Sequence, residues 1–117
     1  MHIPELVAHR GYALHYPENT LIGIEAAIRA GARYIEVDVQ LSADKVPVLF
    51  HDRTLDRLCR VEGTIHRYTR EELKAIHVFE FDRFGYKFAQ NPVTTLAELG
   101  ALLTRHPQVT AFIELKR

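Results

Sequence analysis

The sequence is short of cysteine, of net charge and of long hydrophobic runs, and each shortage excludes a class of protein. Cys59 is the single cysteine, which excludes a disulfide within the chain and favours a reducing compartment. Lys plus Arg number 15, as do Asp plus Glu, so no excess positive charge marks a nucleic-acid or anionic-membrane partner. No apolar run approaches the roughly 18 residues of a membrane span. Residues 1–4 run directly into the first expected strand and leave no room for a signal peptide, so we expect a soluble cytoplasmic protein.

What the sequence does contain is one pattern at four places: an apolar run that ends in polar residues suited to catalysis. Successive side chains of a strand point to opposite faces, so Glu36 and Asp38 share one face and aliphatic side chains take the other. Charged residues near the C-terminal ends of several strands are typical of the active-site rim of a parallel β/α barrel. The four runs are residues 6–10, 35–39, 48–52 and 112–116.

The length of the chain limits this interpretation to part of a barrel. Its 117 residues and 47% hydrophobic content are those of an ordinary single globular domain. A complete β/α barrel typically needs about 250 residues. Because the sequence stops just after the fourth charged strand, we expect an α/β fold in which residues 1–117 form the N-terminal half of a TIM-type (β/α)8 barrel, with its first four strands.

The connections between the expected strands differ in length. Asn19 or Thr20 is expected to cap a helix that Gly31 closes, before a strand over residues 34–41. The next connection is too short for a crossover helix, so we predict a helix-less connection between the second and third strands. Residues 53–92 form a longer excursion, in which a capping box opens a helix over 71–77. A second box at residues 95–98 opens a helix that continues to about residue 105.

Three carboxylates in these strands predict a metal site. Glu36 and Asp38 offer hard oxygen ligands on one strand face, and Glu114 adds a third carboxylate from a neighbouring strand. Like charges this close repel each other unless a cation holds them or protons are taken up. Carboxylates without cysteine favour Mg²⁺ or Ca²⁺ over Zn²⁺. Alternatively, Glu36 and Asp38 form the solvent face of an edge strand, but the four polar strand ends together favour the metal site.

Two histidines and two cationic residues accompany the carboxylates. His9 and His51 end different strands and can face one cavity, where they can serve as general acid and base. Asp52 either orients His51 or starts the following turn, and we favour the turn. Arg10 can bind phosphate oxygens through two nitrogens, and Lys116 adds a point charge. This combination suits a phosphodiester, because the cations offset charge on the phosphoryl oxygens while the histidines move protons.

Five motifs follow one another along the chain: His9-Arg10-Gly11, Pro17-Glu18-Asn19-Thr20, residues 36–41, residues 48–52 and Glu114-Leu115-Lys116. Together they resemble the glycerophosphodiester phosphodiesterase family. The resemblance spans nearly the whole chain, and motifs in this order at this spacing are highly specific.

The resemblance implies a metal-dependent hydrolase on a barrel of the phospholipase C-like phosphodiesterase kind. Its substrates would be small glycerophosphodiesters such as glycerophosphocholine, and its products glycerol 3-phosphate and an alcohol. The excursion at residues 53–92 matches a family segment that lies over the active site and helps to choose the substrate. The matching positions are metal ligands at Glu36, Asp38 and Glu114, general acid and base at His9 and His51, and phosphate contacts at Arg10 and Lys116.

Two features depart from the family pattern. Leu58 and Cys59 stand where family members often have small hydroxyl residues, and the second half of the barrel is absent. One alternative is a related phosphodiesterase, a phospholipase or a sphingomyelinase D, which shares the His, Glu-x-Asp, His pattern. Another is a catalytically inactive half-barrel that acts by association, because open edges on the first and fourth strands favour pairing with a further chain.

Overall fold

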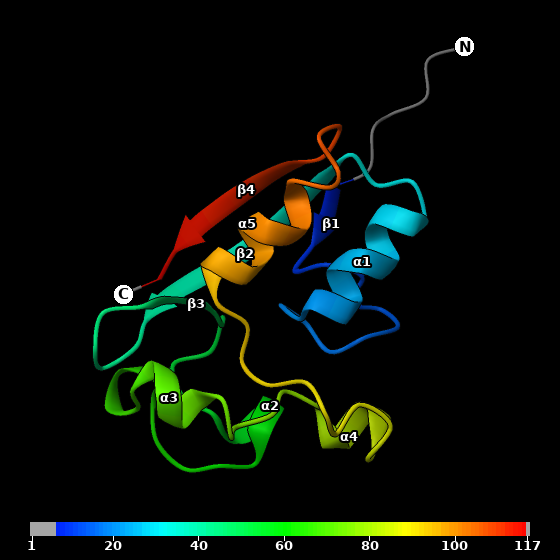
Figure 1. Ribbon diagram of the computed structural model, residues 1–117. Helices are drawn as coiled ribbons and strands as arrows, with labels where there is room; N and C mark the ends of the chain where they lie inside the picture. Colours follow the sequence, from blue (N-terminus) through cyan, green and yellow to red (C-terminus); the bar gives the residue numbers. More distant parts are fainter. Residues whose placement is uncertain (1–6, 117) are drawn as a thin grey trace.

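The computed structural model describes residues 7–116, so the expected strand start at Leu6 and the two chain ends lie outside the described part. Within that part a small sheet is covered by short helices (Figure 1). No helix among the described residues is long and apolar enough to cross a bilayer. The elements are β1 (Val7–His9), α1 (Leu21–Arg29), β2 (Tyr34–Leu41), β3 (Pro47–Leu49), α2 (Asp56–Cys59), the 3₁₀ helix η1 (Ile65–Arg67), α3 (Arg70–Leu73), α4 (Phe81–Phe84), α5 (Leu96–Leu103) and β4 (Thr110–Leu115).

Strand β2 is the centre of the sheet. β1 pairs in parallel with its first half and places His9 opposite Glu36. β4 pairs in parallel along β2 and places Glu114 opposite Asp38. β3 returns antiparallel to the end of β2. β4 occupies one edge of β2. The other edge is therefore shared by β1 and β3, which pair with opposite ends of β2.

The direction of β3 corrects the expectation of four successive strands of a parallel barrel. Only β1, β2 and β4 run parallel in the described part of the chain, and β3 is the return strand of a hairpin. Residues 42–46 form a turn without a helix, in which Ser42 N–H donates to Val46 O at 3.0 Å. An antiparallel neighbour needs no crossover, so the short connection and the reversed strand have the same cause.

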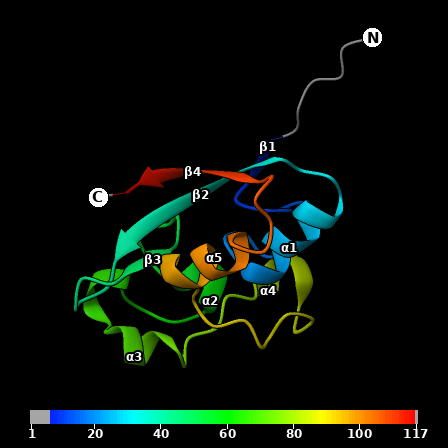
Figure 2. The same ribbon diagram turned by 45° about the horizontal axis from the view of Figure 1, so that its top comes forward.

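The aliphatic face of β2 packs against helices, as the alternation of its sequence predicts. Ile35 and Val37 are fully buried and share one core with Ile24 of α1 and with Leu99 and Leu102 of α5. Figures 1 and 2 show α1 and α5 on the same side of the sheet. This packing leaves the opposite face of β2 to its polar residues.

The excursion forms a second core beside the hairpin. Its buried residues come from β3 and from the segments that follow it, and they include Val48, Phe50, Leu55, Leu58, Cys59, Ile65, Leu73, Ile76, Val78 and Val93. Phe50 is fully buried at the point where the chain leaves the sheet. The excursion therefore anchors the segment that carries His51.

Side-chain caps mark the starts of three helices, α1, α3 and α5. Thr20 caps α1 by accepting from Gly23 N–H at 3.2 Å, and Gly31 follows the helix with φ 98°. Both predicted capping boxes are present, at Thr69 and at Thr95. Helix α3 is shorter than predicted because residues 76–78 pair with residues 91–93, which draws the chain out of the helix.

The outer edges of β1 and β4 carry exposed apolar side chains. Val7 is 55% exposed, Phe112 51%, Ile113 46% and Leu115 76%. No strand pairs with either outer edge within residues 7–116. Open, apolar edges of this kind are sites for pairing with further strands.

Candidate active site

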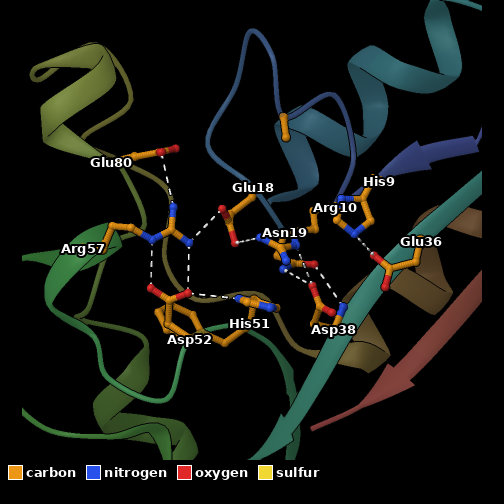
Figure 3. A network of polar contacts seen from close by, with 12 residues as sticks. His9, Arg10, Glu18, Asn19, Glu36, Asp38, His51, Asp52, Arg57 and Glu80 are labelled. Carbon is orange, nitrogen blue, oxygen red and sulfur yellow. Dashed lines mark hydrogen bonds and ion pairs between the residues drawn. The ribbon is translucent and has the colours of Figure 1, made fainter.

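The two short strands β1 and β3 lie along one edge of β2, and their C-terminal ends point toward each other. β1 ends at His9, and Arg10 N–H donates to Glu36 O at 2.6 Å. β3 arrives from the opposite end, and Phe50 N–H donates to Asp38 O at 2.9 Å. The residues that follow each strand therefore approach the same stretch of β2 (Figure 3). Opposed strands, and not neighbouring parallel ones, bring the two histidine-bearing segments together.

Glu36, Asp38 and Glu114 form a carboxylate trio on the polar face of the sheet. One ligand oxygen of each lies within 4.8 Å of the others. Glu36 Oε1 and Asp38 Oδ1 are buried and accept no hydrogen bond from the described residues. Burial, and then the Asp38 charge, raises the pKa of Glu36. Buried carboxylate oxygens without a donor are costly, and a divalent cation of the Mg²⁺ or Ca²⁺ kind suits this all-oxygen set.

Two cationic side chains, Arg10 and Lys116, lie beside the trio. Arg10 Nε is 3.2 Å from Asp38 Oδ2, an ion pair too bent for a hydrogen bond. Lys116 Nζ donates to Glu114 Oε1 at 3.0 Å and lies 3.7 Å from Asp38 Oδ1. The hydrogen bond from Lys116 lowers the pKa of Glu114, and the same bond raises the pKa of Lys116. Both cations are therefore placed to meet an anionic group bound at the trio.

The two histidines differ in their partners. His9 Nε2 is 3.5 Å from Glu36 Oε1, whereas His51 Nδ1 is 3.0 Å from Asp52 Oδ1. Asp52 lies in the bend at residues 52–53, in line with the favoured interpretation, and its carboxylate also contacts His51, so the two interpretations do not exclude each other. The hydrogen bonds from Arg57 lower the pKa of Asp52. Because an ionised carboxylate only accepts, this contact favours the tautomer with the proton on His51 Nδ1, and within residues 7–116 no side chain contacts its Nε2.

Asn19 and Gln40 belong to the site, although the sequence reasoning gave them no role there. Asn19 Oδ1 accepts from Asp38 N–H at 3.2 Å, and its Nδ2 donates to Asp38 Oδ2 at 3.1 Å. Gln40 Nε2 donates to the carbonyls of Phe50 and Asp52 at 2.9 and 2.7 Å. Strand alternation places Gln40 on the same face as Asp38, so this residue could have been found from the sequence.

Arg57 and two glutamates form a second polar group next to His51. Arg57 donates to both oxygens of Asp52 and to Glu18 Oε1, and its Nη1 lies 3.4 Å from Glu80 Oε1 (Figure 3). Glu18 was noted only as part of a motif, and Glu80 was not singled out. No spacing signal predicts these contacts, because their partners lie up to 39 positions apart.

Comparison with known proteins identifies the family. Residues 9–117 match the Glycerophosphoryl diester phosphodiesterase family. A glycerophosphodiester phosphodiesterase of Caldanaerobacter subterraneus subsp. tengcongensis is 40% identical over 98 residues, which cover 84% of this chain and 40% of the relative. Its counterpart from Bacillus altitudinis is 38% identical over 115 residues, covering 96% and 45%.

Solved structures agree with this similarity. A phosphodiesterase of Oleispira antarctica, in complex with the product sn-glycerol-3-phosphate, has a TM-score of 0.87 and 33% identity, covering 97% of this chain and 45% of that one. A glycerophosphodiester phosphodiesterase of Thermotoga maritima has a TM-score of 0.80 and 34% identity, covering 100% and 46%. The chain thus spans less than half the length of these relatives. It belongs to the glycerophosphoryl diester phosphodiesterase family.

Proposed function

We propose that this chain supplies the active-site part of an enzyme that hydrolyses glycerophosphodiesters to glycerol 3-phosphate and an alcohol. One observation carries the proposal: the carboxylate trio has two buried oxygens without hydrogen bonds and is flanked by Arg10 and Lys116. Family membership and the product bound to a relative support the substrate class. The activity belongs to lipid and glycerol metabolism.

The trio of Glu36, Asp38 and Glu114 would hold one Mg²⁺ or Ca²⁺ ion. When bound, the ion would withdraw negative charge from the phosphoryl oxygens and so make the phosphorus easier to attack. Arg10 and Lys116 would contact the remaining phosphate oxygens, Arg10 through two parallel N–H donors and Lys116 as a point charge. These two side chains lie on either side of Asp38, which supports a phosphate placed over the trio.

His9 and His51 would move the protons of the hydrolysis. One imidazole takes the proton of the attacking water, and the other donates a proton to the alcohol oxygen as its bond to phosphorus breaks. His51 has a free Nε2 for this purpose because Asp52 accepts from its Nδ1. His9, the last residue of β1, lies beside Glu36 of β2.

Release of glycerol 3-phosphate from glycerophosphocholine by the 117-residue chain tests the proposal, with Mg²⁺ or Ca²⁺ and a chelator control. We expect release that the chelator abolishes. Absence of release from this chain, and from one extended past Arg117, would refute it. Activity on an intact lipid in place of the deacylated diester would favour the phospholipase or sphingomyelinase D alternative.

We also propose that residues 1–117 are the first part of a β/α barrel whose open edges pair with further strands. Three parallel strands with helices on one side support this, as do the exposed apolar residues of β1 and β4. Two copies would supply six parallel strands, fewer than the eight of a complete barrel, so self-association would cover an edge without completing that barrel. Sedimentation at several concentrations, with Leu115→Glu as a control, tests the pairing. A well-folded monomer at every concentration would contradict the pairing. That result would also remove the support for the alternative of an inactive fragment that acts by association.

We place the protein in the cytoplasm because of its cysteine usage. Cys59 is buried and unpaired, as expected in a reducing compartment. Cell fractionation tests this location, and recovery of the protein from an oxidising compartment would contradict it.

A further inference from the structure

We propose that Arg57 is a positioning residue, which holds the Asp52 carboxylate and through it fixes the imidazole of His51. The inference rests on the proposed acid–base role of His51. Arg57 touches neither the carboxylate trio nor the two phosphate-contacting cations in the contacts of the described residues. Its effect on the reaction therefore passes through its partners.

The geometry at Asp52 is bidentate. Arg57 Nε donates to Asp52 Oδ2 at 2.8 Å, and Nη2 donates to Oδ1 at 3.0 Å. Two parallel bonds from a planar guanidinium leave a carboxylate little freedom to rotate. Asp52 Oδ1, so held, also accepts from His51 Nδ1 at 3.0 Å. The orientation of the imidazole is thereby set by Arg57, although Arg57 does not touch it.

Arg57 also connects this histidine to the opposite side of the site. Its Nη2 donates to Glu18 Oε1 at 2.9 Å, and the other oxygen of Glu18 accepts from Arg10 Nη1 at 3.2 Å. Glu18 is buried, so loss of either arginine would leave its carboxylate with a single partner. One guanidinium thus ties the loop that follows β1 to the segment that follows β3.

A third partner anchors the guanidinium from the excursion. Buried Glu80 lies 3.4 Å from Arg57 Nη1 and 3.3 Å from Arg83 Nη1, in a left-handed conformation with φ 48°. Arg83 Nη2 donates to the carbonyls of Ala13 and Leu14 at 2.7 and 2.9 Å. A non-glycine residue held in this strained conformation indicates that its surroundings demand it.

The same contacts argue against a second metal site at this place. Glu18, His51 and Asp52 offer ligand atoms within 4.8 Å of one another. Arg57 already donates to one oxygen of Glu18 and to both oxygens of Asp52. Arg57, together with Arg10 at Glu18, therefore offsets the negative charge that would attract a cation, and the group serves to orient His51.

Kinetics of Arg57→Met, Asp52→Asn and the double variant test the proposal on glycerophosphocholine. We expect Arg57→Met to lower kcat on the order of a hundredfold, the scale of a misplaced catalytic group, with a much smaller change in KM. Arg57→Lys should recover little, because an ammonium group cannot bind both oxygens in parallel. The control Arg29→Met removes an arginine that pairs with Glu25 at 3.8 Å on the exposed face of α1, and should leave kcat unchanged.

The double variant separates positioning from general support of the fold. If Arg57 acts through Asp52, the double variant should be no slower than the slower single variant. Losses that multiply, or a kcat for Arg57→Met equal to that of the unaltered chain, would overturn the inference. Circular dichroism and urea unfolding of each variant identify any that fail to fold.

Nitrogen NMR of the histidines provides a readout that needs no activity. In spectra recorded at about pH 8, His51, assigned from its loss in His51→Gln, should carry its proton on Nδ1. Arg57→Met should shift His51 toward a mixture of tautomers, while Arg29→Met should not. If neither this chain nor one extended past Arg117 released glycerol 3-phosphate, the proposed function would fall, and this shift would still support the positioning role. An unchanged His51 tautomer in a folded Arg57→Met variant would overturn the positioning role of Arg57.

Discussion

Replacement of His51 by alanine is expected to remove one proton-transfer group while the cation site stays in place. The imidazole is 32% exposed and contacts Asp52 at 3.0 Å, outside the carboxylate trio of Glu36, Asp38 and Glu114. Its loss therefore deletes a partly exposed ring without opening a cavity in either hydrophobic core. We expect the variant to fold and to bind Mg²⁺ or Ca²⁺ as the unaltered chain does.

The magnitude follows from the role of the group. Acid–base catalysis by a positioned side chain contributes about 10²–10⁴-fold, or roughly 3–5 kcal/mol of activation free energy. His51→Ala should lower kcat by that factor. His9→Ala should do the same, but it also removes the partner of Glu36 at 3.5 Å, so a modest change in metal affinity accompanies it.

The assay is glycerol 3-phosphate release at saturating metal, combined with calorimetric titration of the metal. His66→Ala is the matched control, because His66 is an exposed histidine of η1 whose Nδ1 lies 3.0 Å from Leu41 O. The control should keep full activity. A kcat of His51→Ala equal to that of the control would refute the acid–base assignment. A loss of metal binding in His51→Ala would refute the separation of the two roles.

Three further outcomes are expected. Asp38→Ala should weaken Mg²⁺ or Ca²⁺ binding by more than about tenfold in calorimetry, since even residues that only support ligands are worth 10–100-fold; unchanged affinity would contradict the ligand assignment. Burial raises the pKa of Cys59 to about 12, so thiol reagents should leave it unmodified at neutral pH until urea unfolds the chain. Rapid modification of the folded chain would contradict this. Thr95→Ala removes the cap that accepts from Glu98 N–H at 3.1 Å, and should lower the free energy of unfolding by about 1 kcal/mol in urea titration at unchanged m value; an unchanged midpoint would show that the cap adds no stability.

Local chemistry made much of the fold predictable. The bounds of β2 agree with the sequence alone, because alternation of charge and aliphatic residues specifies both a strand and its two faces. The helix starts at Thr69 and Thr95 also agree, since a capping box is a pattern of four adjacent residues. Of the residues nominated for the site, Arg10, Lys116, Glu36 and Glu114 lie close to Asp38, although they come from strand ends far apart in the chain.

The missed features depend on contacts between distant segments. The sequence analysis recognised that the connection after β2 is too short for a helix. It did not predict the consequence, that β3 runs antiparallel to β2. The contact of Asp52 with His51 was not favoured from the sequence, because the partner Arg57 could not be located without the fold of the excursion. Asn19 caps no helix and instead binds Asp38, 19 positions away.

The most direct test of the central claim is the divalent-ion dependence of glycerol 3-phosphate release, measured side by side for the unaltered chain and Asp38→Ala. The account predicts saturable activation of the unaltered chain by Mg²⁺ or Ca²⁺, and activation of Asp38→Ala only at much higher ion concentration. Identical activation curves, or release that a chelator leaves intact, would contradict the claim that the carboxylate trio holds a catalytic cation.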